Sequence, residues 1–201
     1  MTAPRHRLIV VSDARACPRS LPEQVRRALE GGAFALILRD KDLGWAHRMR
    51  LAEELEPVLE AAGGRLIVAD PPEPVPAAHL SARFPVPRPR PALLGRSVHA
   101  GEPIDPGLDY VTYSPVWTPA SKPGYGPAVG LAGLAERAAS TPVAVYALGG
   151  VTGPARALAV REAGAAGAAV QGAVMRAEDP GPVVSRLREA LSGQSVGPDH
   201  L

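Results

Sequence analysis

The chain has 201 residues, 46% of them hydrophobic, and a formal net charge of only +2. This length favours a single domain with a substantial core, which we place at residues 1–192 before a flexible tail at 193–201. No apolar run approaches the roughly 20 residues that a membrane-spanning helix needs. The small charge and the 4% aromatic content argue against a nucleic-acid-binding module.

The cysteine content and the N-terminus indicate the compartment. Cys17 is the single cysteine, which excludes an internal disulfide and fits a reducing compartment. Residues 1–7 lead straight into a short apolar run and lack the longer apolar region and the cleavage site of a signal peptide. We therefore expect a cytoplasmic protein in which Cys17 has no catalytic role.

Strand patterns and helix patterns alternate along the chain. The predicted strands are eight apolar runs at 7–13, 33–38, 65–69, 77–80, 92–99, 109–114, 143–148 and 165–170. The predicted helices lie between a Ser20 cap and a Gly31 stop, and at 43–62, 129–139, 154–163 and 182–191.

The strands are apolar on consecutive residues, as expected when both faces of a parallel sheet are buried. Eight strand and helix units predict an α/β protein with a small (β/α)8 TIM barrel fold. Because the chain is short for that fold, we expect some helices to be trimmed, in particular after Asp70 and after His99. An open doubly wound sheet is the alternative.

The seventh strand run ends at Gly149 and Gly150, and a helix start follows it. Thr152 is expected to cap that helix, and Pro154 suits its first turn. Such a turn directs backbone N–H groups and the positive end of a helix dipole toward an anion. We interpret it as a phosphate site; the alternative is a tight turn with no ligand.

Polar groups follow several predicted strands and would meet at the carboxyl end of a barrel. They are Asp13, Arg39, Asp40, Lys41, Asp70, His99, Ser121, Lys122 and the backbone amides of Gly149, Gly150, Gln171 and Gly172. Cations and anion-binding amides with few carboxylates suit a phosphorylated or pyrophosphorylated substrate, with Mg²⁺ on Asp70. Alternatives remain open: Arg39 and Lys41 could belong to a surface loop or a structural ion pair, and His99 could be a core histidine.

Five segments, in order, resemble the thiamine phosphate synthase/TenI family. They are Leu-Arg-Asp-Lys-Asp-Leu at 38–43, Leu-Gly-Arg-Ser-Val-His at 94–99, Asp-Tyr-Val through Pro-Val-Trp to Ser-Lys at 109–122, Ala-Leu-Gly-Gly-Val-Thr at 147–152 and Gly-Ala-Ala-Val-Gln-Gly at 167–172. The resemblance implies a (β/α)8 barrel that binds a thiazole phosphate at the glycine turn. In the synthase branch it also implies a pyrimidine methyl diphosphate and Mg²⁺.

This resemblance also implies roles for individual residues. The catalytic residues would be Lys41, Lys122 and His99, the substrate-binding residues Arg39, Ser121, Gly149, Gly150, Gln171 and Gly172, and the metal ligand Asp70. The implied partners are small phosphorylated substrates, and neither nucleic acid nor membrane. A homodimer is the assembly that we consider.

The chain departs from the family's patterns at several positions. Ile37 replaces a glutamine of the synthase pattern, and the residues after His79 lack a second metal-binding aspartate, which should weaken Mg²⁺ binding. Gly172 replaces a serine that supports phosphate, and Pro115 replaces a histidine of the tautomerase pattern. A synthase is the first hypothesis. The alternatives are a TenI-like thiazole tautomerase that uses His99 and a non-catalytic regulator that binds thiazole or thiamine phosphate.

Overall fold

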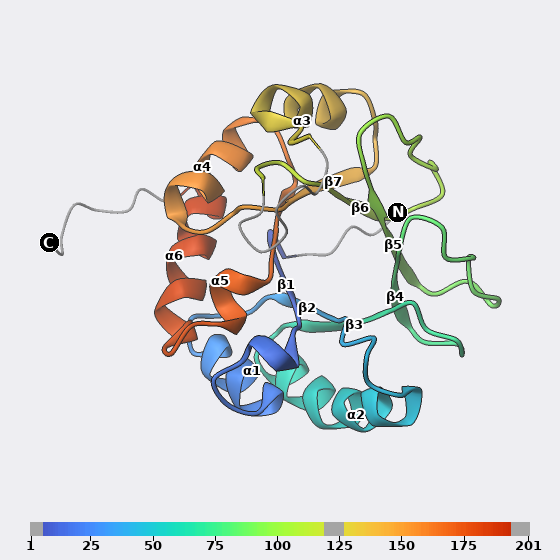
Figure 1. Cartoon of the computed structure of the whole chain (residues 1–201), viewed down its shortest axis with the longest axis vertical. Helices are drawn as coiled ribbons and strands as arrows, with labels where there is room; N and C mark the ends of the chain where they lie inside the picture. The colour runs from blue at the N-terminus through green and yellow to red at the C-terminus, as the bar shows by residue number, and fades with distance from the viewer. Residues whose placement is uncertain (1–5, 119–126, 194–201) are drawn as a thin grey trace, which may run out of the picture.

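The computed structural model describes residues 6–118 and 127–193. Its eight strands form one closed parallel barrel in chain order, in which β8 pairs with β1 (Figure 1). The strands are β1 (Leu8–Val11), β2 (Ala35–Leu38), β3 (Arg65–Ala69), β4 (Ala77–Leu80), β5 (Leu93–Val98), β6 (Tyr110–Tyr113), β7 (Ala144–Leu148) and β8 (Gly167–Val170). The predicted (β/α)8 fold is confirmed, and the open sheet is excluded.

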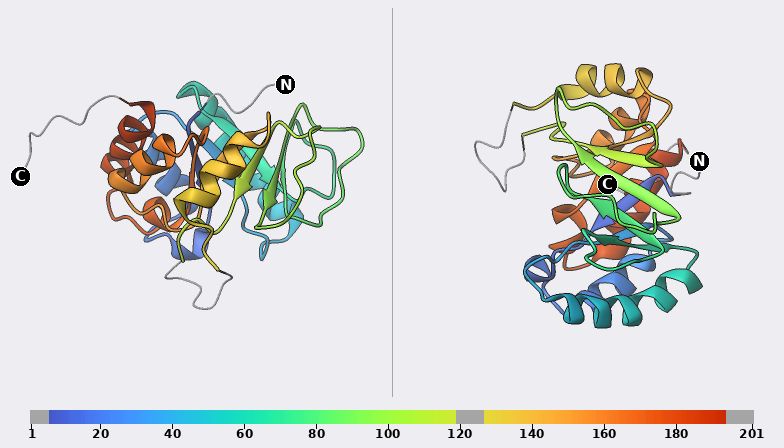
Figure 2. Two further views of the ribbon diagram at one scale, coloured as in Figure 1. Left: turned by 90° about the horizontal axis from the view of Figure 1, so that it is seen from above. Right: turned by 90° about the vertical axis from the view of Figure 1, so that its right-hand side faces the viewer.

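Helices surround only part of this barrel. They are η1 (Ala14–Ala16, a 3-10 helix), α1 (Leu21–Leu29), α2 (Trp45–Ala61), α3 (Gly130–Ala139), α4 (Pro154–Glu162), α5 (Gly172–Met175) and α6 (Pro180–Ser192). No helix lies in the described chain between β3 and β6, and irregular segments extend from that side, opposite α4 and α6 (Figure 2). The trimming predicted after Asp70 and His99 is therefore confirmed, and the segment at 81–92 is also without a helix.

Local signals account for some helix ends and not for others. The Ser20 hydroxyl accepts a hydrogen bond from the Glu23 amide (3.4 Å), so the predicted cap of α1 is confirmed. The predicted Thr152 cap is wrong, because the chain remains extended through Gly153, which becomes the N-cap of α4 without a side-chain hydrogen bond. The two shortest helices, η1 and α5, were not predicted, since three or four residues show no helical periodicity.

Alternate residues of each strand pack in two separate layers. On β1, Leu8 and Val10 face the helices, whereas Ile9 and Val11 face the interior of the barrel. Tyr110 and Tyr146 fill that interior in an edge-to-face contact with ring centroids 5.7 Å apart. Both faces of the strands are thus buried, which explains the consecutive apolar residues of the sequence.

The C-terminal boundary is only partly tested. Helix α6 runs to Ser192, and residues 194–201 lie outside the described chain, so the division between a domain at 1–192 and a tail stays a prediction. Within the described chain, no helix combines the length and the apolar character that crossing a membrane requires.

Candidate active site

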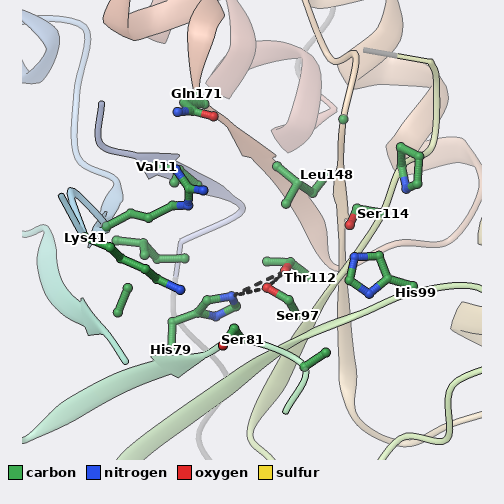
Figure 3. Close-up of a pocket in the computed structure, with 16 residues that line it drawn as sticks. Val11, Lys41, His79, Ser81, Ser97, His99, Thr112, Ser114, Leu148 and Gln171 are labelled. Carbon is green, nitrogen blue, oxygen red and sulfur yellow. Dashed lines mark hydrogen bonds between the residues drawn. The ribbon is translucent and has the colours of Figure 1, made fainter. Parts of the chain in front are cut away.

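A cavity of about 290 Å³ opens at the carboxyl ends of the strands, where the site is predicted. Arg39 and Lys41 both line it, as their alternation in the sequence predicts. Figure 3 shows Lys41, His79 and His99 reaching into it from different strand ends. The other lining residues are Val11, Ile37, Ala69, Ser81, Ala82, Ser97, Thr112, Ser114, Pro115, Leu148, Gly149 and Gln171. Cations, neutral polar groups and apolar walls therefore share one cavity, a combination that suits an organic phosphate.

Lys41 forms an ion pair with Asp70 at this cavity. Asp70 has a φ of +40°, which is uncommon for a residue other than glycine. Its amide donates to the His79 carbonyl (3.0 Å), and its other carboxylate oxygen accepts from the Ser81 amide (2.7 Å). Burial raises the pKa of Asp70, but the hydrogen bonds from Lys41 and Ser81 outweigh this effect and lower it. Asp70 is therefore ionised and pairs with Lys41, which also lines the cavity, so the catalytic role of Lys41 stays a prediction.

A buried histidine network, which the sequence pattern did not single out, lines the barrel side of the cavity. His79 Nδ1 lies 3.0 Å from Tyr110 Oη. His79 Nε2 lies 3.0 Å from Ser97 Oγ and 3.4 Å from Thr112 Oγ1 (Figure 3). Burial lowers the pKa of His79 to about 3, so the ring is neutral near pH 7. The sequence contained one signal for this position. His79 lies two residues after Ala77 on a short apolar strand, and this spacing points both side chains into the barrel.

His99 follows the last residue of β5 and is only partly buried. Its Nδ1 lies 3.2 Å from a carboxylate oxygen of Glu102, and its amide donates to the same oxygen (2.7 Å). Burial raises the pKa of Glu102, but these bonds from His99 outweigh it and lower that pKa. The alternative of a core histidine is therefore wrong: His99 lies on the cavity wall beside an acid that orients its ring.

The glycine turn after β7 lies only partly at the cavity. Gly149, with a φ of +95°, lines it, whereas Gly150, with a φ of +77°, is not among the lining residues. A Cβ atom on Gly150 would lie 2.5 Å from Trp117 Cβ, and Arg156 donates to the Gly150 carbonyl. The predicted phosphate turn therefore reaches the cavity through Gly149, while side chains pack closely around Gly150.

The turn after β8 shows the same division. Gln171 lines the cavity, and its amide nitrogen donates to the Asp13 carboxylate (2.8 Å). Gly172 is not among the lining residues, and the guanidinium of Arg176 lies 2.1 Å from where a Gly172 Cβ would be. Of the two residues predicted here, the structure brings only Gln171 to the cavity.

Asp40 and Cys17 have contacts and burial that indicate structural roles. Asp40 accepts hydrogen bonds from the Ser12 hydroxyl and from the Ala14 amide (2.6 Å), so it orders the loop after β1. Cys17 is half-buried, and burial raises the pKa of its thiol to about 11. Cys17 is thus protonated near pH 7, in accord with the absence of a predicted catalytic role.

Comparisons with known proteins find relatives over most of the chain. The chain is 38% identical over 190 residues to the thiamine-phosphate synthase of Roseiflexus castenholzii, which covers 85% of this chain and 82% of that protein. It is 34% identical to the thiamine-phosphate synthase of Thermobifida fusca, with 92% of each chain covered. The structure matches thiamine phosphate pyrophosphorylase from Pyrococcus furiosus with a TM-score of 0.77 at 25% identity, over 93% of this chain and 96% of that one.

The profile of the TMP-TENI family, described as thiamine monophosphate synthase, matches residues 8–82 and 88–174. This chain belongs to the thiamine monophosphate synthase family. The resemblance seen in the sequence is thereby confirmed. Two residues to which the family pattern gives a role, Ser121 and Lys122, lie outside the described residues, so their roles stay predictions.

The Mg²⁺ that this family implies does not fit the residues present. Both carboxylate oxygens of Asp70 already have partners, Lys41 and the Ser81 amide. The described residues contain no group of three or more His, Cys, Asp or Glu side chains that could hold a metal ion. Since Mg²⁺ is bound through carboxylates and other hard oxygen ligands, a single carboxylate paired with an ammonium is a poor site for it.

Proposed function

We propose that this member of the thiamine monophosphate synthase family joins a hydroxymethylpyrimidine diphosphate to a thiazole phosphate and releases pyrophosphate. The observation that carries the proposal is the placement of Arg39 and Lys41 on one cavity together with apolar side chains such as Val11, Ile37 and Leu148. Relatives named thiamine-phosphate synthase match this chain over most of their length.

The chemistry needs charge neutralisation more than acid or base groups. When the bond between the pyrimidine methylene carbon and the diphosphate oxygen breaks, its electron pair leaves with pyrophosphate and a carbocation remains. The thiazole nitrogen then donates its lone pair to that carbon and forms the new C–N bond. Arg39 and Lys41 lie where they can stabilise the departing anion, and Asp70 holds the Lys41 ammonium in place.

The neutral part of the cavity suits the carbocation. A protonated histidine would repel a cation, but burial keeps His79 uncharged near pH 7. Ser97 and Thr112 beside it are also uncharged. Apolar walls, which include Val11, Ile37 and Leu148, exclude water that would otherwise trap the carbocation, and they confine the two rings. We assign the phosphate of the thiazole to the end of the cavity at Gly149 and Gln171.

The test is turnover of both substrates by the purified protein, followed through pyrophosphate release and the mass of the product. We expect Lys41→Ala to lower kcat/KM at least 100-fold, because one preorganised charge on a developing anion contributes about 2.7–4 kcal/mol. Arg26→Ala is the matched control, since it removes a surface ion pair with Glu54 on the helical layer. No pyrophosphate at high enzyme concentration would reject the synthase proposal, and full activity of Lys41→Ala would reject the role of Lys41.

A thiazole tautomerase is the second candidate, favoured by the pair of His99 and Glu102 at the cavity wall. Such an enzyme needs an acid or base and no pyrophosphate chemistry. Conversion of a thiazole carboxylate phosphate that is lost in His99→Asn would favour it. Binding of the thiazole phosphate with no turnover of any kind would leave a non-catalytic binder. The partners are small phosphorylated molecules in each case. A homodimer stays a prediction, and size-exclusion chromatography with light scattering would measure the oligomeric state.

A further inference from the structure

Arg96 holds a segment of the cavity wall from behind. It lies on β5, and one guanidinium nitrogen donates to the carbonyls of Ser81 (3.0 Å) and Ala82 (2.8 Å). Both of these residues line the cavity, although Arg96 itself does not. Burial is the main cause of the lowered pKa of His79, and the positive charges of Lys41 and Arg96 lower that pKa further.

The segment that Arg96 holds ends the first range that the family profile matches. The family profile matches up to residue 82 and resumes at residue 88. The second metal-binding aspartate of the pattern should fall within a few residues of His79, but residues 81–84 are Ser-Ala-Arg-Phe. An acidic group is therefore missing from the segment that Arg96 holds, whereas Arg96 itself belongs to the segment at 94–99 that resembles the family.

The charges around Asp70 are consequently balanced without a metal. Lys41 occupies one carboxylate oxygen of Asp70, and the Ser81 amide occupies the other. The Ser81 and Ala82 carbonyls, which are oxygens that a cation could use, accept from Arg96. A divalent cation would have to displace Lys41 from Asp70. Coulomb repulsion from the displaced ammonium, and from the Arg96 guanidinium bonded to the Ser81 carbonyl, would oppose this.

We infer that the cavity binds the pyrophosphate group of its substrate without a divalent cation, with Arg96 holding the segment at Ser81 and Ala82, where a second metal-binding aspartate is missing. The inference rests on the proposed function, because it concerns the diphosphate of the proposed substrate. In this arrangement Arg39 and Lys41 contact the anion. Arg96 is a positioning residue that holds the segment at Ser81 and Ala82 and disfavours Mg²⁺ at Asp70.

The first test is calorimetric titration of pyrophosphate into the whole protein, once with EDTA and once with Mg²⁺. We expect binding in EDTA that Mg²⁺ does not strengthen. Arg96→Gln should weaken binding in EDTA about 10-fold and should make it stronger with Mg²⁺ than without, since the repulsion is reduced; a purely structural role would not create this metal dependence. Arg96→Lys should recover part of the affinity, and Arg88→Gln, the same charge change in the same irregular segment, should change it less than about 2-fold.

The second test measures the metal directly, by electron paramagnetic resonance of Mn²⁺ mixed with the protein. We expect no stoichiometric binding to the wild type. Stoichiometric Mn²⁺ binding that Asp70→Asn abolishes, or pyrophosphate binding that needs Mg²⁺, would overturn the inference.

The outcomes also separate this inference from the proposed function. Turnover with Mg²⁺ but none with EDTA would leave the synthase proposal intact and reject metal-independent binding. Failure of turnover under both conditions would reject the synthase proposal, and the pyrophosphate titration would still decide the inference. Thermal unfolding of each variant checks that the chain is folded.

Discussion

At the scale of single residues, Asp70 connects the backbone of the barrel to the charge of its cavity. A φ of +40° places it in a region where most side chains are strained and where aspartate and asparagine are better tolerated. The hydrogen bonds to His79 and Ser81 hold that conformation, and the same carboxylate fixes Lys41. The residue thus has a conformational role and an electrostatic role that substitutions can separate.

We predict that Asp70→Asn lowers the free energy of unfolding by less than about 1 kcal/mol, because asparagine tolerates the backbone conformation and a partly exposed ion pair contributes little. Asp70→Ala should cost about 1–3 kcal/mol, since it adds strain and leaves the Ser81 amide without its acceptor. Urea denaturation at pH 7 measures both. Equal costs for the two variants would show that backbone conformation does not matter at this position.

At the scale of elements, the turn between β7 and α4 is built around its glycines. Gly149 faces the cavity, and Gly150 packs against Trp117, whose indole ring lies under the Arg156 guanidinium (4.9 Å to the ring centroid). The turn, Trp117 and the first turn of α4 therefore form one packed unit. A change within that unit should affect both stability and the affinity for the thiazole phosphate.

We predict that Gly150→Ala costs about 1–3 kcal/mol of stability and raises KM for the thiazole phosphate. Its φ of +77° is unfavourable for alanine, and the new Cβ would lie 2.5 Å from Trp117 Cβ. The control is Gly153→Ala in the same turn, where a Cβ would meet nothing within 4 Å; it should cost less than about 1 kcal/mol. Denaturation measures the change in stability, and steady-state kinetics measure the change in KM. An unchanged KM for Gly150→Ala would show that this turn does not contribute to binding the thiazole phosphate.

At the scale of the whole molecule, the barrel is short-stranded and filled by two tyrosines below the cavity. Tyr110 packs under Gly95 of the neighbouring strand and carries the hydroxyl that contacts His79. A single packed interior thus supports the polar floor of the site. This coupling makes a core substitution at Gly95 a test of how tightly the interior is filled.

We predict that Gly95→Ala costs about 1–3 kcal/mol, because a Cβ there would lie 2.1 Å from the Tyr110 ring in a close-packed core. Gly133→Ala, in the interior of α3, should instead stabilise the protein by about 0.5–1 kcal/mol, since its Cβ has room and alanine is the better helix former. Thermal denaturation of the two variants should therefore show shifts of opposite sign. Equal shifts would mean that the interior is loosely packed.

The order of strands and helices, the parallel barrel and the family could all be predicted from local patterns, because they depend on periodicity and on motifs that are read along the chain. The sequence also placed Arg39 and Lys41 on one face, since a two-residue spacing after a strand fixes that geometry.

Which of the predicted residues share the cavity follows from the folded chain and not from local patterns. The pairing of Lys41 with Asp70, the His79 network and the position of Arg96 each join residues from different strands. Such contacts depend on the register and closure of the whole barrel, which local patterns do not encode. The exclusion of Gly150 and Gly172 has the same cause, since the side chains that pack against them, Trp117 and Arg176, take up positions that only the folded chain defines.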